Sequence, residues 1–373
     1  MAPTALLAEQ HQRNFAQWFA PLGVSVQLLS GQQTAAERRA GLAALADGRA
    51  QLVIGTHALF QEQVVFAQLG LVIVDEQHRF GVHQRLALSD KGASLERAMS
   101  RPHQLVMTAT PIPRTLAMSA YADLDVSIID ELPPGRTPIT TALVRSDRRE
   151  QLIERISTVC GQGRQAYWVC PLVEDSERIE AQAAESTAEY LREALPHLRV
   201  GLVHGRMTAA EKNAEMARFK AHEMDLLVAT TVIEVGVDVP NASLMLIENA
   251  DRMGLAQLHQ LRGRVGRGTV ASFCVLLFDE PLSDKARARL QLMRETQDGF
   301  KLAEADLVQR GPGEILGTRQ TGLAKLKVAD LVLDAPWLAL ARSLADELIA
   351  EQSPTIPALL RRWIGAAQHY GQV

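Results

Sequence analysis

The chain has 373 residues, of which 47% are hydrophobic and 22% are charged, and its formal net charge is −4. These values are ordinary for globular domains, and the length leaves room for two or three of them. The acidic balance argues against a protein that coats nucleic acid through bulk charge, and no apolar run approaches the roughly 20 residues of a membrane span. Cys160, Cys170 and Cys274 lie far apart without metal-binding spacing, which fits buried thiols in a reducing cytosol.

The first third of the chain predicts helices that alternate with short strands. A helix is expected from a cap at Thr4 through Trp18, and a second one over residues 34–46. Aliphatic runs predict buried strands at 24–30, 51–55, 70–74 and 104–107. Strands that alternate with helices indicate a parallel α/β sheet.

A linker is predicted at residues 132–136, Leu-Pro-Pro-Gly-Arg, and a second α/β series follows it. Its strands are expected near 142–144, 166–173, 199–204, 226–230, 244–248 and 271–278, with helices over 148–160, 181–195 and 209–221. From residue 282 onward the pattern is helical, interrupted by glycine-containing stretches at 309–314 and 317–322. The expected fold class is therefore α/β, with two parallel-sheet domains and a helical C-terminal part.

The strand over 70–74 ends on four polar residues, Asp75, Glu76, Gln77 and His78. In open α/β sheets, ligands bind just beyond the carboxyl ends of the strands. Two adjacent carboxylates there are costly unless a cation or a reaction uses them. Asp75 is therefore a candidate ligand of phosphate-bound Mg²⁺, and Glu76 is a candidate to act on an attacking water. The plain alternative is an aspartate that caps a helix in an exposed loop.

The segment 262–268 places three arginines and three glycines within seven residues. Glycine is unfavourable inside a helix, so a simple basic helix does not explain the pattern. Guanidinium forks bind phosphate groups through two hydrogen bonds, which predicts a polyphosphate partner. Arg264 and Arg267 are then candidate arginine fingers, and the alternative is a solvated basic loop.

A second candidate segment, 229–240, follows a predicted buried strand. Thr230 and Thr231 are placed to cap a helix whose N-terminus faces a phosphate group. Asp238, which follows Gly236, is placed to reach a ribose hydroxyl or an arginine. The alternative is an ordinary capped helix with a glycine stop and a turn.

These motifs stand in an order that resembles the superfamily 2 helicases. The segments 75–78, 108–110, 230–238 and 260–267 resemble helicase motifs II, III, V and VI, and Pro3-Thr4 and Gly55-Thr56 resemble motifs Ia and Ib. Four such motifs in register are far more specific than any one of them.

A narrower resemblance is to the branched-DNA translocases, namely the RecG family and the transcription-repair coupling factor. It rests on residues 75–82 and 108–115, and on the segment 304–322, which resembles the translocation motif of these proteins. Residues 167–174 resemble the RecG version of motif IV, and a helical tail follows the translocation motif as in RecG, where the coupling factor continues into another domain.

The resemblance implies two RecA-like motor domains, the first incomplete, followed by a C-terminal helical hairpin and tail. The implied boundaries are 1–132 and 137–280 for the motor domains and 281–373 for the helical part. ATP and Mg²⁺ are the implied cofactors. Branched DNA, such as forks and Holliday junctions, is the implied partner. The implied state is a monomer that does not bind membranes, and the implied location is the bacterial cytoplasm, at the nucleoid.

The resemblance also implies a role for each matching residue. Asp75 holds Mg²⁺ through water, Glu76 orients and deprotonates the attacking water, and Gln260, Arg264 and Arg267 complete the catalytic set. Gly236 and Asp238 meet the nucleotide. The implied coupling residues are His78, Thr108, Thr110, Arg310 and Gln320, and the implied contacts with the DNA backbone are Thr4, Gly31, Thr56, Arg206 and Thr230.

The phosphate-binding loop of such motors, Gly-x-x-x-x-Gly-Lys-Ser/Thr, does not occur in residues 1–373, which contain no Gly-Lys dipeptide. Residue 5 is alanine where the family usually has glutamate, and the wedge domain of RecG has no counterpart in the chain. We therefore expect an open internal strand edge and low stability in the first domain, whereas residues 137–280 should fold well.

Three hypotheses follow from these observations. The chain is the motor portion of a RecG-type helicase for branch migration and fork reversal in recombination and repair, inactive alone because it lacks the phosphate-binding loop. Alternatively, it is a DNA-binding remnant that hydrolyses nothing. The third hypothesis is the motor of a coupling factor, whose partner is RNA polymerase.

Overall fold

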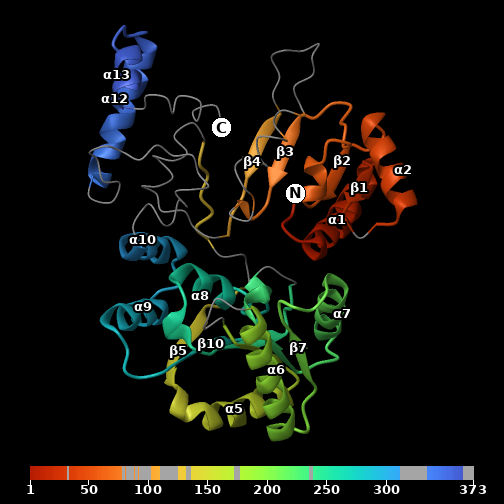
Figure 1. The fold of residues 1–373 in the computed structure, drawn as a ribbon, viewed down its shortest axis with the longest axis vertical. Coiled ribbons are helices and arrows are strands. Elements are labelled where there is room, and N and C mark those ends of the chain that lie inside the picture. The colour runs from red at the N-terminus through yellow and green to blue at the C-terminus, as the bar shows by residue number, and fades with distance from the viewer. Residues whose placement is uncertain are drawn as a thin grey trace. The chain divides into compact units, whose positions relative to one another are not determined.

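The computed structural model describes residues 1–31, 33–77, 80, 88, 91, 102–109, 125–131, 136–171, 177–234, 238–310 and 334–363. The chain divides into two compact units, one formed by residues 1–127 with 307–373 and the other by residues 128–306. Figure 1 labels the elements of both units and colours them by residue number.

The described part of the first unit begins with helices and strands that alternate. Its elements are α1 (Ala5–Phe19), η1 (Ala20–Leu22), β1 (Val26–Leu29), α2 (Ala35–Ala46), β2 (Leu52–Gly55), η2 (His57–Phe60), β3 (Leu71–Val74) and β4 (His103–Val106), then η7 (Ala335–Trp337), α12 (Leu338–Ala350) and α13 (Ile356–Trp363). Thr4 caps α1, as predicted, because its hydroxyl accepts a hydrogen bond from Leu7 N–H at 3.3 Å. Thr34 and Glu37 form a capping box at the start of α2.

The four strands that the structure describes in the first unit form two parallel pairs, β1 with β2 and β3 with β4. Met1 and Ala2 lie between these pairs. The Met1 amine donates to Ile73 O at 2.7 Å, Asp75 N–H donates to Met1 O at 3.1 Å, and Ala2 N–H donates to Gly55 O at 2.9 Å. Met1 therefore pairs with the end of β3 as a parallel strand residue does, and Ala2 reaches the end of β2.

Among the described residues, the remaining length of β2 and β3 has no strand partner on the side where Met1 and Ala2 lie. A parallel strand turns alternate residues to opposite edges, so Val53 of β2 and Leu71 of β3 present their backbone groups to the side where Met1 and Ala2 lie. Within the described residues, no other backbone segment pairs with β2 or β3 on that side. For the described residues, this agrees with the open internal edge expected from the sequence, and the expected low stability of the first domain stays a prediction.

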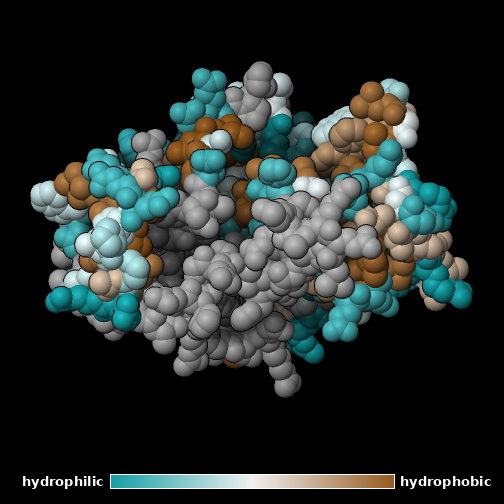
Figure 2. All heavy atoms as spheres, turned by 90° about the horizontal axis from the view of Figure 1, so that it is seen from above, coloured by the Kyte–Doolittle hydropathy of each residue, from teal (hydrophilic) through white to brown (hydrophobic). Residues whose placement is uncertain are grey.

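Helices α12 and α13 carry apolar side chains that remain at the surface. Trp337, just before α12, and Ile349 within it are each 64% exposed, and neither helix contains a buried residue. Figure 2 shows hydrophobic residues, in brown, among hydrophilic ones on the face that it presents. These two helices therefore add little to the apolar core of the described residues.

The second unit contains one sheet flanked by helices. Its elements are β5 (Ile139–Arg145), η4 (Ser146–Arg148), α5 (Arg149–Gly161), β6 (Gln165–Val169), α6 (Glu177–Ala194), β7 (Val200–Val203), α7 (Ala209–Lys220), β8 (Leu226–Ala229), η5 (Thr231–Glu234), β9 (Ala242–Ile247), η6 (Ala250–Arg252), α8 (Leu255–Arg262), β10 (Ser272–Phe278), α9 (Asp284–Glu295) and α10 (Gly299–Arg310), the last of which extends past residue 306. The six parallel strands follow the order β5-β10-β9-β6-β8-β7.

Both faces of this sheet are covered, which explains why its inner strands are mostly apolar and buried. On one face, Trp168 packs in a buried cluster with residues of α5 and α6, including Ile156 and Leu191. On the other face, the ring of Tyr167 contacts that of Phe219 from α7, with 4.9 Å between their centres. Figure 1 shows α5 and α6 together beside the sheet.

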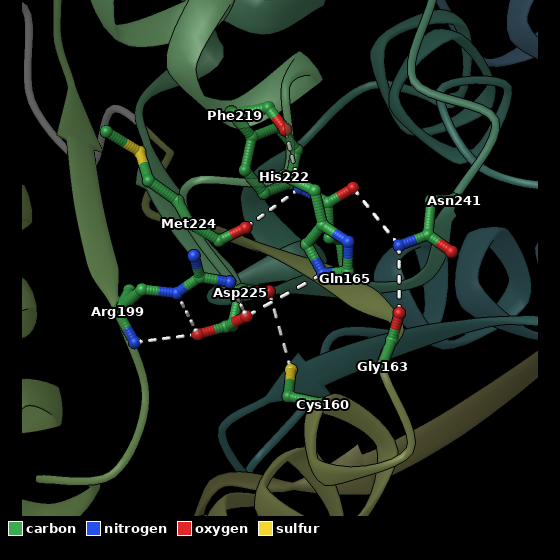
Figure 3. A network of polar contacts seen from close by, with 9 residues as sticks. All are labelled: Cys160, Gly163, Gln165, Arg199, Phe219, His222, Met224, Asp225 and Asn241. Atoms are coloured by element: carbon green, nitrogen blue, oxygen red, sulfur yellow. Dashed lines mark hydrogen bonds and ion pairs between the residues drawn. The ribbon is translucent and has the colours of Figure 1, made fainter.

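Polar contacts fix the amino ends of β6 and β8 (Figure 3). The amide of Gln165 is buried and donates to Phe219 O at 2.6 Å and Met224 O at 2.8 Å. Arg199 forms two hydrogen bonds with the carboxylate of Asp225, at 2.7 and 3.0 Å, and these bonds hold the pKa of Asp225 below its ordinary value. The network ties the turn after α7 to the sheet.

The strands predicted from the sequence are all present, with ends that shift by a few residues. Helix α6 begins at Glu177, earlier than the predicted start at Ala181. The translocation segment from 311 to 322 lies outside the described residues, as does most of the predicted linker at 132–136. Of the helices that the structure describes, none combines the length and apolar character needed to cross a lipid bilayer.

Candidate functional site

In the first unit, the candidate site starts where β3 ends. The carboxylate of Asp75 is engaged at both oxygens: Oδ1 accepts the Glu76 N–H at 3.0 Å, and Oδ2 lies 3.1 Å from Nε2 of His11 on α1. Both the His11 and Asp75 side chains are largely but not fully shielded, with 29% and 23% of their areas exposed. Asp75 is therefore held in one orientation and still reaches solvent.

Glu76 has an unusual backbone and a fixed side chain. Its φ angle is +52°, in the left-handed region that non-glycine residues rarely adopt. Such strain is concentrated at functional sites. The carboxylate of Glu76 accepts the Ala109 N–H at 3.3 Å, and Gln77 N–H donates to Met107 O at 3.1 Å. The segments that follow β3 and β4 are thus joined, as expected for neighbouring parallel strands.

These donors fit a magnesium ion that is held mainly by phosphate and water. Mg²⁺ keeps several waters and takes one or two carboxylates from a protein. Among the described residues, no group of three or more histidine, cysteine, aspartate or glutamate side chains is arranged to hold a metal ion. Asp75 provides a solvent-accessible carboxylate at the end of a strand, which matches this requirement.

Two of the coupling residues predicted beside this site cannot be located. His78 and Thr110 lie outside the described residues. Thr108 is half-buried and follows β4, on the same segment as Ala109. The structure therefore brings Asp75, Glu76 and Thr108 to the carboxyl ends of paired strands.

In the second unit, Arg267 contacts Asp238, a pairing that the sequence allowed for. Nη1 of Arg267 lies 3.3 Å from Oδ1 of Asp238, and Arg267 Nε donates to Gly263 O at 3.3 Å. Arg136 donates to Gly266 O at 3.0 Å. Burial, together with the charge of Arg267, lowers the pKa of Arg136. Three charged groups therefore meet around the loop after α8.

The glycines of this loop are explained by local packing. Gly266 has φ +74°, and an added Cβ would lie 2.7 Å from a carbon of Ile139. A Cβ on Gly268 would lie 2.7 Å from Pro240 O. Both glycines are needed to fold the loop itself, which is a more immediate reason than the close approach to a partner that the sequence suggested.

Arg262, next to the predicted fingers, is a structural residue that the sequence did not single out. Its guanidinium is buried and donates to Met293 O at 2.8 Å, Thr296 O at 2.9 Å and Thr141 Oγ1 at 3.4 Å. It also lies 3.1 Å from Nδ1 of His259. The only sequence signal was the position of Arg262 at the end of a helix with an apolar face. Arg264 is half-buried, and Gln260 lies on α8.

The segment after β8 differs from the predicted capped helix. The described residues Thr231–Glu234 form a 3₁₀ helix, and the N–H and hydroxyl of Thr231 both lie 3.4 Å from Oε1 of Glu180 on α6. Thr230 is fully buried, and its hydroxyl has no hydrogen-bond partner within the described part of the chain. The carboxylate of Glu180 thus accepts the hydrogen bonds of Thr231 that the sequence suggested for a phosphate group. Gly236 lies outside the described residues.

The residues predicted to contact DNA differ in exposure. Gly31 and Arg206 are exposed, Thr4 is half-buried at its cap, and Thr56 is buried. A phosphate reaches Thr56 or Thr230 only if neighbouring residues move. Arg310 ends α10 but its side chain is outside the description, as is Gln320.

Known proteins resemble the chain along most of its length. Residues 1–119 match the DEAD/DEAH box helicase model, residues 147–269 the helicase conserved C-terminal domain, and residues 296–359 the C-terminal part of domain 3 of the ATP-dependent DNA helicase RecG. The chain is 61% identical over 371 residues to the ATP-dependent DNA helicase RecG of Escherichia coli K12. The chain belongs to the RecG family of ATP-dependent DNA helicases.

Membership of the RecG family is supported by more distant relatives and by a solved structure. RecG of Thermotoga maritima is 47% identical over 352 residues. A structure of RecG bound to a three-way DNA junction matches with a TM-score of 0.69 and 44% identity, over 91% of this chain and 43% of that one. Mycobacterium smegmatis Lhr, at 19% identity and a TM-score of 0.56 over 78% of this chain and 42% of that one, shares the fold. The chain therefore contains two RecA-like helicase domains and C-terminal helices.

The RecG relatives are longer than this chain. The match covers 99% of this chain and 53% of the E. coli protein, and 94% of this chain and 44% of the T. maritima protein. The chain thus spans about half the length of the curated relatives that it matches.

Proposed function

We propose that this chain is the motor portion of an ATP-dependent helicase that acts on branched DNA, in branch migration and fork reversal during recombination and repair. The observation that carries the proposal is the Asp75–Glu76 pair, which lies at the carboxyl end of β3 in a chain 61% identical to E. coli RecG. The related structure of RecG on a three-way junction supports branched DNA as the partner. The proposed location, the bacterial cytoplasm at the nucleoid, follows from this partner, and the proposed state is a monomer.

The proposed roles of the nucleotide-binding residues follow from their chemistry. Mg²⁺ bound with ATP would neutralise charge on the phosphates, and Asp75 would hold it through water. Glu76 would orient the attacking water and accept its proton on a carboxylate oxygen. The remaining residues of this set are Gln260, Arg264 and Arg267, which would stabilise developing charge, and Gly236 and Asp238, which would meet the nucleotide.

The proposed DNA contacts are sequence-independent. Hydroxyl groups, glycine backbone and a single arginine suit the phosphate backbone, and the proposed residues are Thr4, Gly31, Thr56, Arg206 and Thr230. His78, Thr108, Thr110, Arg310 and Gln320 would relay the state of the nucleotide to these contacts. We propose the boundaries 1–132, 137–280 and 281–373 for the two motor domains and the helical part.

We infer that residues 1–373 do not hydrolyse ATP by themselves. The Gly-x-x-x-x-Gly-Lys-Ser/Thr loop that cradles the phosphates does not occur in them. Without this loop, the carboxylates and arginines have no fixed nucleotide to act on. DNA binding does not depend on the loop and should persist.

The test combines ATP hydrolysis with binding of a synthetic three-way junction. The chain should bind the junction with an affinity that falls as salt increases, and its ATP turnover should not exceed that of a Glu76→Gln variant. Arg206→Ala should reduce the salt slope by about one, since one phosphate contact is lost. Arg252→Ala, at another exposed arginine, serves as the control and should leave the slope unchanged.

Two outcomes would contradict these proposals separately. DNA-stimulated turnover that Glu76→Gln abolishes would refute the claim of inactivity and support the assigned catalytic residues. A chain that binds no junction at low salt would refute both the motor proposal and the alternative of a DNA-binding remnant.

A further inference from the structure

His11 is a residue outside the helicase motifs that touches the proposed magnesium carboxylate. It lies on α1, 64 residues before Asp75, and its Nε2 is 3.1 Å from Asp75 Oδ2. With less than a third of either side chain exposed, this hydrogen bond is partly shielded from water. Such shielding makes the bond more effective than a surface contact between the same groups.

The contact completes the fixation of Asp75. The backbone of Asp75 is held by its N–H, which donates to Met1 O at 3.1 Å, and Oδ1 accepts the Glu76 N–H at 3.0 Å. The first bond fixes the backbone of Asp75, and the second restrains one oxygen of its carboxylate. His11 supplies the side-chain partner at Oδ2, and so restrains its rotation.

We propose that His11 is a positioning residue, which holds the Asp75 carboxylate in the orientation that accepts a hydrated divalent cation. The inference rests on the proposed magnesium role of Asp75. Partners that hydrogen-bond to a metal ligand orient it and are commonly worth 10- to 100-fold in metal affinity. His11 acts through Asp75 and does not itself contact the cation.

The position of His11 links this site to the start of α1. Thr4, the cap of α1 and a proposed DNA contact, lies seven residues before His11, about 10 Å along a helix. Between them, Ala8 is fully buried against the β1–β2 side, in a cluster that includes Ile54. The same packed helix therefore carries both the Thr4 cap and the side chain that contacts the Asp75 carboxylate.

The first experiment measures binding of Mn²⁺ alone, as a spectroscopic substitute for Mg²⁺, from the electron paramagnetic resonance signal of the free ion. His11→Ala should weaken binding about 10-fold, whereas His11→Gln, which retains an N–H donor, should stay within about threefold of the parent. Asp75→Asn should weaken binding at least as much as His11→Ala. His103→Ala, at an exposed histidine of the same unit, is the matched control and should have no effect.

The outcomes separate the inference from the proposed function. If Asp75→Asn weakens binding but His11→Ala does not, the positioning role is wrong and the magnesium site stands. If Asp75→Asn binds Mn²⁺ like the parent, the magnesium site and the positioning role both fail. Circular dichroism of each variant confirms that the fold is retained.

A second experiment needs no cation. Nitrogen-15 NMR of the imidazole should show His11 with its proton on Nε2, because that nitrogen faces Asp75 Oδ2. Asp75→Asn should change this tautomer population or the Nε2 chemical shift. An unchanged His11 ring spectrum in Asp75→Asn would overturn the inference, since the hydrogen bond on which it rests would be absent.

Discussion

His259 is half-buried next to a positive charge and is therefore held neutral. Its Nδ1 lies 3.1 Å from Nη2 of Arg262, so that nitrogen must accept and the proton of the neutral ring is on Nε2. Burial, assisted by the charges of Arg262 and Arg136, lowers the pKa of His259 to about 4. Protonation would place a second cation beside Arg262 at a site that is partly shielded from water.

This arrangement predicts that acid destabilises the second unit. The unfolded chain protonates His259 near its ordinary pKa of about 6.5, whereas the folded state does so only near 4, so stability is complete above pH 6.5 and is lost as the pH falls towards 4. Between about pH 7.5 and pH 5, the free energy of unfolding should fall by about 2 kcal/mol, measured with urea at each pH. His259→Asn, whose Oδ1 can still accept from Arg262, should flatten the dependence.

The control for this prediction is His197→Asn, at an exposed histidine of the same unit. It should retain the pH dependence of the parent. A His259→Asn variant with an undiminished slope would show that another group is responsible.

Site residues could be predicted from the sequence where they belong to a local motif, and not where their role depends on a partner distant in the chain. Asp238 and Arg267 belong to motifs, so their pairing was foreseen as one of two options. His11 and Arg262 act through partners 64 and 31 residues away, and nothing in a local pattern reveals such contacts. Thr230 shows the opposite case, since a hydroxyl at the end of a strand suggested exposure and the side chain is buried.

At the scale of elements, α8 is joined to α9 by the buried Arg262. Its guanidinium donates to the carbonyl groups of Met293 and Thr296, which lie at the carboxyl end of α9, the negative end of that helix dipole. Within the described residues, its hydrogen-bond partners are carbonyl, hydroxyl and imidazole groups. The helix that precedes the predicted arginine fingers is therefore tied to the helical part that follows the sheet.

Removal of this tie should destabilise the second unit. Arg262→Ala leaves buried carbonyl groups without a donor, and each such group costs about 1–3 kcal/mol, so we expect a loss of about 3 kcal/mol in urea unfolding. Arg262→Lys should recover only part of the loss, because an ammonium group cannot reproduce the planar fork. Arg252→Ala, at an exposed arginine, should stay within about 0.5 kcal/mol of the parent, and equal losses in the Ala variants would contradict the role of Arg262.

The regular elements were more predictable than the site, for a physical reason. Strands buried on both faces need largely apolar runs, so β6, β8 and β9 can be recognised in the sequence. Element ends depend on tertiary contacts, so α6 begins earlier than its helical pattern suggested. The pairing of Met1 with β3 has no sequence signal, because two residues show no periodicity.

At the scale of the molecule, the two units differ in how completely their strands are paired. The second unit has six strands in one sheet, and β6 lies between β8 and β9 with partners on both sides. In the described part of the first unit, the strands form two separate pairs, joined at their ends through Met1 and Ala2. Backbone groups that lack a partner within the sheet exchange and open more readily. The first unit should therefore be the less stable of the two.

This difference is tested by urea unfolding together with hydrogen exchange followed by NMR. Unfolding should proceed in two transitions, the first unit before the second. Within β2 and β3, the amides of Val53 and Leu71 face the open side and should exchange at least about 10-fold faster than those of Leu52 and Val72, which face their partner strands. Residues of β6 serve as the internal control, because both edges of that strand are paired and neighbouring amides should be protected alike. One cooperative transition, with equal protection of alternate residues in β3, would show that the open edge does not limit the stability of the first unit.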